Sequence, residues 1–321
     1  MAYLPYYLTP EEFEVYQEEQ EKQIRSSKLV NEWSCNNIEE ANRYDALLFT
    51  AWSSLLPGLI VMGPIGYIGY EHFNWIAPFC IFIVFSIVAY SWYLTVGLDN
   101  HYKYTLSHIG LVQKQNRAEP KWLNKAIQSV AWICSIGCLL AVAIAGPMVL
   151  VGSGALMLLA FGMTKRQPQN FVETTVAMRD DWLFAHYNKR RKVIQLFHKY
   201  DYCAYEDVAA TIACRTQGRC GTYLFFDTIE ELTNTLTLLS VSYKLECIEI
   251  DDHKHIFSIE GQSPERLLQI PARANTYSVA ETYDLKANNA PLPNWEYMYS
   301  GKWVTEQELR EASNRSGSLT E

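Results

Sequence analysis

The chain has 321 residues and a net charge of −8, and 19% of its residues are charged. This length allows one or two domains, and the acidic balance argues against nucleic acid as a partner. The charges are spread unevenly: Glu71 is the single charged residue between Ala46 and Leu98, and none falls between Ile127 and Met163. Long uncharged stretches between charged flanks are typical of membrane-spanning segments.

Residues 1–45 are predicted to form a helical arm. Thr9, Pro10 and Glu12 have the spacing of a capping box with proline at the first helical position, and the helix is expected to reach Lys28. The N-terminus lacks a basic region followed by a short apolar core, so we expect the first span to be kept as an uncleaved anchor.

Residues 46–98 are predicted to form a first transmembrane hairpin, with spans at Ala46–Tyr70 and Trp75–Leu98. Each span is longer than the ~20 residues that cross a bilayer as a helix. Gly63, Gly66 and Gly69 give the first span a small-residue face, which lets helices approach closely in lipid. We interpret that face as packing against the second span. A homo-oligomer contact or a kinked helix lining a path is the alternative.

Residues 99–126 are predicted to be a loop with a short strand at Ile109–Val112, and residues 127–163 a second transmembrane hairpin. Gly146-Pro147 divides this second stretch into two spans near the lower limit of length. A hairpin that enters one leaflet and returns is the alternative, and the sequence does not decide between them.

The distribution of lysine and arginine predicts the orientation. The segments flanking the hairpins are basic, whereas the Glu71 turn and the Gly146-Pro147 turn contain no lysine or arginine. Basic flanks stay in the cytosol. We therefore expect a multi-pass protein of a bacterial inner membrane with both termini in the cytosol.

Residues 164–262 are predicted to form a cytosolic α+β domain. A long helix is expected at residues 170–200, a buried strand at Thr222–Phe226, and a helix from Asp227 to Leu239. The alternating run Leu245–Ile250 predicts a strand, with His255–Glu260 as its hairpin partner.

Residues 263–321 are predicted to be an extended linker followed by a small closing element. The linker covers Ser263–Pro293, and Thr305 to Glu308 forms a further capping box that starts a short helix. The expected fold class is thus membrane all-α, with four transmembrane helices in two hairpins, plus a C-terminal cytosolic α+β domain.

Lys189, Arg190, Arg191 and Lys192 form the densest basic cluster. A basic cluster this near a membrane anchor is typical of contact with anionic lipid headgroups. A solvated helix face, or contact with the acidic N-terminal arm, is the alternative interpretation.

Cysteine and histidine residues offer a weaker signal. His198, Cys203, Cys214 and Cys220 are too widely spaced for the close cysteine pairs of a zinc site, and Asp251–His255 has the composition of a charged turn. No phosphate-binding loop or catalytic motif is present, and Gly218-Arg-Cys-Gly221 does not match one. We predict no metal and no cofactor.

The sequence therefore predicts a non-enzymatic multi-pass membrane subunit that presents a cytosolic protein-interaction domain within a larger assembly. Membrane lipids, protein partners and a second copy of the chain are the expected contacts. A membrane-bound sensor that binds a small ligand or anionic lipid is one alternative, and a membrane enzyme using Cys/His chemistry is another. The sequence names neither the assembly nor the partner.

Overall fold

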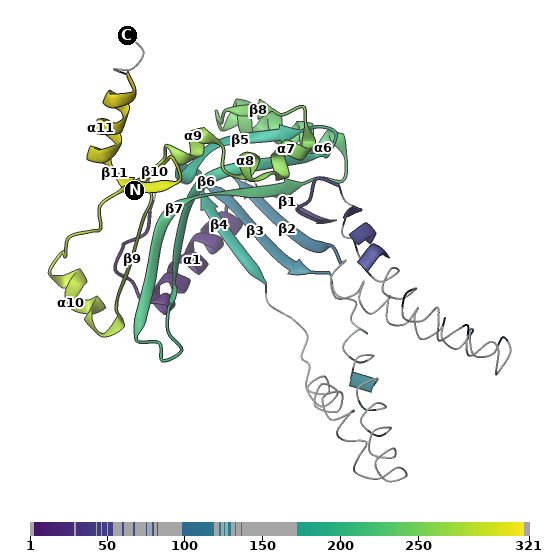
Figure 1. The fold of residues 1–321 in the computed structure, drawn as a ribbon, viewed down its shortest axis with the longest axis horizontal. Coiled ribbons are helices and arrows are strands. Elements are labelled where there is room, and N and C mark those ends of the chain that lie inside the picture. Colours follow the sequence, from purple (N-terminus) through teal and green to yellow (C-terminus); the bar gives the residue numbers. More distant parts are fainter. Residues whose placement is uncertain are drawn as a thin grey trace. The chain divides into compact units, whose positions relative to one another are not determined.

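The computed structural model describes residues 3–28, 30–42, 44–45, 98–118 and 172–317, with isolated or short stretches between 47 and 82 and between 122 and 136. The chain divides into two compact units, one made of residues 1–45, 101–115 and 173–321 and the other of residues 46–100 and 116–172. Nearly all the described residues belong to the first unit, whose elements are drawn in Figure 1.

Sheet A contains four strands in the order β1-β2-β3-β4. They are β1 (Val30–Asn37), β2 (Asn100–Ser107), β3 (Gly110–Arg117) and β4 (Glu173–Met178). The β3–β4 pair is antiparallel, with Val112 opposite Val176. Both long apolar stretches of the sequence are therefore insertions between neighbouring strands of this sheet.

Sheet B contains five strands in the order β8-β5-β6-β7-β9. They are β5 (Trp182–Asn188), β6 (Val193–Tyr205), β7 (Ile212–Phe225), β8 (Cys247–Glu249) and β9 (Arg273–Ser278). The β5–β8 pair is parallel and the other pairs are antiparallel. A short 3₁₀ turn, η1 (Arg179–Asp181), connects β4 of sheet A to β5 of sheet B.

Aromatic side chains join the two sheets into one core. Tyr104 of β2 donates a hydrogen bond from its hydroxyl to the carbonyl of Tyr223 on β7, at 2.8 Å. Trp33 of β1 stacks on Tyr104 with ring centroids 4.9 Å apart, and its indole N–H donates to the carbonyl of Phe225. Large aromatic side chains bury much apolar area, and here their polar ends also satisfy backbone groups.

The helix α1 (Pro10–Arg25) lies alongside β4 and β6 (Figure 1). Its capping box is formed as the sequence predicts: the Thr9 hydroxyl accepts from the Glu12 N–H, and the Glu12 carboxylate accepts from the Thr9 N–H. Phe13 and Ile24 are its buried side chains. The predicted start of the N-terminal helix is confirmed, but the helix ends at Arg25 rather than at Lys28, and β1 occupies part of the predicted helical arm. The helix packs on the sheets rather than forming a core of its own.

A series of short helices follows β7 in the chain. They are α6 (Ile229–Thr237), the π-helical turn η2 (Leu238–Ser242), α7 (His253–Phe257), α8 (Ile259–Gln262) and α9 (Glu265–Leu268). The C-terminal region adds η3 (Val279–Glu281), α10 (Thr282–Ala287), the hairpin of β10 (Glu296–Tyr299) and β11 (Lys302–Thr305), and α11 (Glu306–Gly317).

The predicted fold class, a membrane all-α protein with an appended α+β domain, is wrong for the described chain, because three β-sheets dominate it. Of the helices built from described residues, none combines the length and the apolar character needed to cross a bilayer. The expectation of a multi-pass inner-membrane protein with both termini in the cytosol is corrected on the same finding. The residues of the four predicted spans, Gly63, Gly66 and Gly69 among them, lie outside the described residues apart from isolated positions.

Several predicted elements are corrected as well. The expected helix at 170–200 is the strand series β4, β5 and β6, and the predicted loop at 99–126 supplies two strands, β2 and β3. His255–Glu260 belongs to two short helices rather than to a strand, and the predicted linker contains α9, β9 and α10. The predicted strand at Thr222–Phe226 corresponds only to the end of β7, which already begins at Ile212, and the predicted helix after Asp227 is formed as α6 continued by η2.

Candidate functional site

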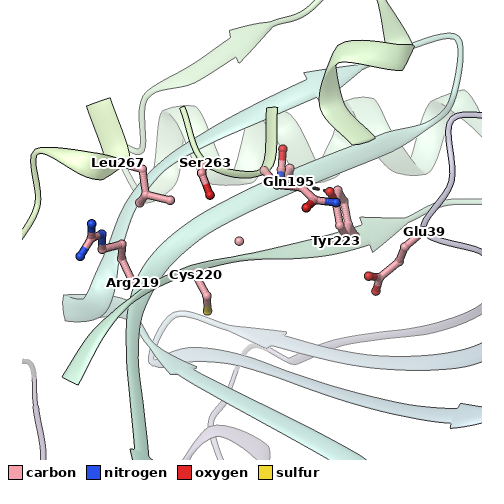
Figure 2. Close-up of a pocket in the computed structure, with 9 residues that line it drawn as sticks. Glu39, Gln195, Arg219, Cys220, Tyr223, Ser263 and Leu267 are labelled. Atoms are coloured by element: carbon pink, nitrogen blue, oxygen red, sulfur yellow. Dashed lines mark hydrogen bonds between the residues drawn. The ribbon is translucent and has the colours of Figure 1, made fainter. Parts of the chain in front are cut away.

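A cleft of about 350 Å³ lies over β6 and β7, and it is the candidate functional site (Figure 2). Side chains alternate between the two faces of a strand. Arg219, Gly221 and Tyr223 therefore share one face of β7, and Gln195 stands directly opposite Tyr223 on β6. Ser263 and Leu267 come from the α8–α9 segment and form a wall, and Glu39 lies at one end of the cleft.

The Gln195 carboxamide is held in one orientation. The hydroxyl of Tyr223 donates to the carbonyl of Ile256 at 3.1 Å, so its oxygen accepts from Nε2 of Gln195 at 3.3 Å. The amide oxygen Oε1 is then left without a hydrogen-bond partner in the described part of the chain, although the residue is only 1% exposed. A buried acceptor of this kind costs about 1–3 kcal/mol unless something donates to it.

Gly221 leaves space in the floor of the cleft. A Cβ at this position would approach Nε2 of Gln195 and a ring carbon of Phe197, each at 3.1 Å. Glycine weakens the interior of a strand, and where it occurs it often marks a close approach by a ligand or another backbone. The glycine therefore keeps the cleft floor free of side-chain atoms beside the unpartnered amide oxygen.

Arg219 places a positive charge at the end of the cleft opposite Glu39 (Figure 2). Its guanidinium lies over the ring of Trp303 at 5.3 Å and makes a long hydrogen bond of 3.4 Å to the carbonyl of Leu268. It forms no ion pair with a described carboxylate. Burial lowers the pKa of Arg219, yet a guanidinium remains charged throughout the physiological range. At the other end, the Glu39 carboxylate accepts a hydrogen bond from the Tyr102 hydroxyl.

Cys220 and His198 lie opposite each other on β7 and β6, with Sγ and Nε2 3.5 Å apart. Burial raises the pKa of the Cys220 thiol to about 12 and lowers the pKa of His198, so both groups are neutral near pH 7. The Nδ1 of His198 faces the Lys199 carbonyl, and its Nε2 faces the Thr222 hydroxyl. Figure 2 shows the Cys220 sulfur directed away from the cleft. This pair lacks the thiolate that nucleophilic cysteine chemistry requires.

Cys203 and Cys214, the other two cysteines considered as zinc ligands in the sequence analysis, lie away from the Cys220–His198 pair. Cys203 packs with Leu8 and Phe13, and Cys214 stands opposite Ala204 farther along β7. Of the described residues, no three His, Cys, Asp or Glu side chains are placed to hold a metal ion. In the predicted charged turn at 251–255, the Asp252 side chain instead caps α7 by accepting from the Lys254 N–H.

The basic cluster lies on the turn between β5 and β6, where internal contacts use most of it. Arg191 donates to the side chain of Asn37 at 2.8 Å and to the carbonyls of Ile38 and Glu40. Lys189 pairs with Glu249 at 2.7 Å, and Lys192 donates to the carbonyl of Asp227. Lipid binding by Lys189–Lys192 stays a prediction. Replacing only Lys189 and Arg190 by glutamine tests it without removing the Arg191 contacts.

Sequence reasoning placed none of the cleft-lining residues in a cleft, and it named Cys220 and Gly221 only as parts of a zinc set and a phosphate loop that it rejected. Gln195 and Tyr223 are separated in sequence and meet only through strand pairing, so no local motif marks them. One usable signal was Gly221, a glycine immediately before the apolar run of a predicted buried strand.

These groups make the cleft a candidate binding site, with an oriented amide acceptor, a cation and an apolar wall, and with no activated nucleophile among the described residues that line it. The sequence matches the TsiV2 immunity protein family over residues 14–258, and the chain belongs to that family. It is 29% identical, over 147 residues, to the immunity protein TsiV2 of Vibrio cholerae serotype O1. The aligned region covers 45% of this chain and 59% of that relative, so the chain spans less than two-thirds of the relative's length. No solved structure matches this chain.

The family corrects the predicted function. A multi-pass membrane scaffold, with its sensor and enzyme alternatives, is replaced by membership in an immunity-protein family. The expectation of a protein partner, in its coarse form, agrees with that family. Membrane lipids, a larger assembly and a second copy of the chain are not shown as partners.

Proposed function

We propose that this chain is an immunity protein that binds a cognate protein toxin and protects the cell that produces both. The observation that carries the proposal is the family match, which covers residues 14–258 of 321. The similarity to the V. cholerae immunity protein supports it. Protection by binding requires a recognition surface and no catalysis, which suits the neutral Cys220–His198 pair and the preformed cleft.

The charge of the chain supports a partner with a positively charged face. The net charge is −8, and the exposed side of α1 carries Glu14, Glu18 and Glu19. Opposite charges on two proteins accelerate their association, and salt screens this attraction. We therefore expect the toxin to present basic residues, and we expect the association rate to fall as the salt concentration rises.

A competition between kin cells tests the proposal. Recipient cells lacking this chain are grown in contact with their parent strain, and their survival is compared with that of recipients that express the full chain. We expect the recipients without the chain to survive worse by an order of magnitude, and expression of the full chain to restore them. Equal survival of both recipients under conditions in which the parent kills unrelated cells would show that the chain confers no immunity.

A further inference from the structure

We propose that the cleft over β6 and β7 binds a short acidic peptide segment of the partner protein. The segment would donate a hydrogen bond to Oε1 of Gln195 and place a carboxylate against Arg219. This proposal rests on the proposed function in naming the toxin as the source of the segment. Binding of a peptide by the cleft can be measured without the toxin.

The shape of the cleft suits a segment of a few residues. Its volume of about 350 Å³ falls at the lower end of the range found for sites that enclose small ligands. Gly221 leaves the floor free of a Cβ, so an extended backbone can approach the strand closely. Leu267, only 3% exposed as a residue, adds apolar surface to the wall.

The polar groups of the cleft determine what the segment must offer. Tyr223 fixes the Gln195 carboxamide so that its oxygen, not its nitrogen, lacks a partner. A backbone N–H of the segment could donate to this oxygen and remove the free-energy cost of a buried acceptor without a partner. Arg219 carries a charge that no described carboxylate neutralises, and a guanidinium binds a carboxylate through two parallel hydrogen bonds. A peptide that contains an acidic residue supplies both groups, because its backbone N–H donates a hydrogen bond and its side chain carries a carboxylate.

The opposite polarity fits less well. A basic segment would place its cation near Glu39. It would leave Arg219 either beside a second positive charge or without an anionic partner. A purely apolar segment would leave both Gln195 and Arg219 without partners, and each would lose contact with water on binding. The acidic segment satisfies both groups at once.

Blocking the cleft mouth tests the proposal in cells. Ser263 is exposed and lines the cleft, so Ser263→Trp fills the entrance without altering the buried floor. Gln269→Trp is the matched control, because Gln269 is exposed on the same segment and does not line the cleft. We expect the Ser263 variant to lose protection in the kin competition while its melting temperature matches that of the control. Full protection by a folded Ser263 variant would overturn the proposal.

A charge variant covers the case in which the Ser263 variant does not fold. Arg219→Gln removes the cation and leaves the cleft open. We expect it to lose protection, and Arg190→Gln, on the distant β5–β6 turn, to keep it. If the wild-type chain itself fails to protect, the proposed function fails, and the cleft is then judged by peptide binding alone.

The direct probe is the peptide N-acetyl-Ala-Ala-Glu with an amidated C-terminus, so that the Glu side chain is its single carboxylate, added to the purified full chain. At a peptide concentration of about five times its Kd, we expect the melting temperature to rise by about 2–4 °C. The uncharged peptide N-acetyl-Ala-Ala-Gln with an amidated C-terminus should produce a smaller shift, and Ser263→Trp should abolish the shift for both. No shift with either peptide, or equal shifts in the wild-type and Ser263→Trp proteins, would contradict an acidic-peptide site.

Discussion

The guanidinium of Arg215 and the carboxylate of Asp201 form an ion pair beneath the N-terminal segment, with Nη2 and Oδ2 2.9 Å apart. Arg215 is fully buried. It also donates to the carbonyls of Pro5, Tyr6 and Tyr202, at distances of 3.0–3.1 Å. The Arg215 side chain thus connects Pro5 and Tyr6, which precede α1, to sheet B through hydrogen bonds.

Replacement of Arg215 should therefore be severe. Arg215→Met removes the ion-pair partner of the Asp201 carboxylate and one donor from each of the three carbonyls. The Leu4 N–H still donates to Asp201, and the Tyr277 hydroxyl still donates to the Tyr6 carbonyl. Breaking a buried pair in this way costs about 3–5 kcal/mol. Urea unfolding monitored by circular dichroism measures the loss. Arg190→Met, on an exposed arginine, is the control and should change stability by less than ~0.5 kcal/mol. Similar stabilities for the two variants would show that Arg215 does not anchor the N-terminus.

Arg191 and Arg190 are adjacent in sequence but differ in their contacts. Arg191 holds the end of β1 through Asn37 and the carbonyls of Ile38 and Glu40, whereas Arg190 is exposed. We expect Arg191→Ala to lower the free energy of unfolding by roughly 1–3 kcal/mol, and Arg190→Ala to leave it nearly unchanged. Parallel denaturation curves measure both. An equal effect of the two changes would mean that the cluster acts as one solvated patch.

Asp181 should make stability depend on pH. Its side chain is largely buried and its Oδ1 has no hydrogen-bond partner among the described residues. The pKa of Asp181 is raised to about 7, chiefly by burial; the nearby Asp201 and Asp180 contribute to the rise, and Lys199 opposes it. In the unfolded chain the pKa of this carboxyl is ~4, so between about pH 4 and pH 7 the Asp181 carboxyl is protonated in the folded state and ionised in the unfolded state. Stability should therefore fall as the pH rises from 4 towards 7.

Asp181→Asn isolates this effect. At about pH 3 the carboxyl is protonated in both the folded and the unfolded protein, and the amide is a close substitute, so the variant and the wild type should differ little. At pH 8 the variant should be more stable by about 1–3 kcal/mol, because the wild type carries a buried negative charge. Thermal unfolding at both pH values gives the comparison. The same difference at the two values would mean that Asp181 titrates normally.

The Cys220 thiol should react slowly. Burial raises its pKa to about 12, so its thiolate fraction near neutral pH is lower than that of a free cysteine by roughly 10³-fold. Iodoacetamide labelling followed by mass spectrometry measures the rate at this site, with the urea-unfolded protein as the reference. Labelling of the native protein at the rate of the unfolded one would contradict the neutral pair with His198 and would favour cysteine chemistry.

Local signals in the sequence predicted the helix starts well. The Thr9–Glu12 and Thr305–Glu308 capping boxes both form, and the predicted cap of α6 lies one residue on, at Thr228 with Glu231. A capping box involves four consecutive residues, so it depends little on the remainder of the fold.

The strand β6 was predicted as part of a helix because its sequence lacks the two-residue alternation of apolar and polar side chains. Residues 193–198 of β6 are buried on both faces, so the alternation of apolar and polar residues that marks a half-buried strand is absent. Val193, Leu196 and Phe197 then imitate the spacing of a helix. The charged turn at Asn188–Lys192 is the local signal that separates β5 from β6 and makes the two strands a hairpin.

The cleft could not be predicted for a different reason. Gln195 and Gly221 meet through the pairing of β6 with β7, and the wall is added by helices more than 30 residues farther along the chain. Asp252 and Ser258 each cap one of those short helices, which is a local signal that the predicted hairpin at His255–Glu260 overlooked.

Binding of the purified full chain to its cognate toxin tests the central claim most directly. The toxin is the protein whose deletion from the parent strain abolishes killing of recipients that lack this chain. Titration calorimetry should give a complex with a Kd at or below about 10⁻⁷ M, the range of stable protein complexes. Absence of binding at micromolar concentrations, while the chain still protects cells, would contradict immunity by direct capture of the toxin.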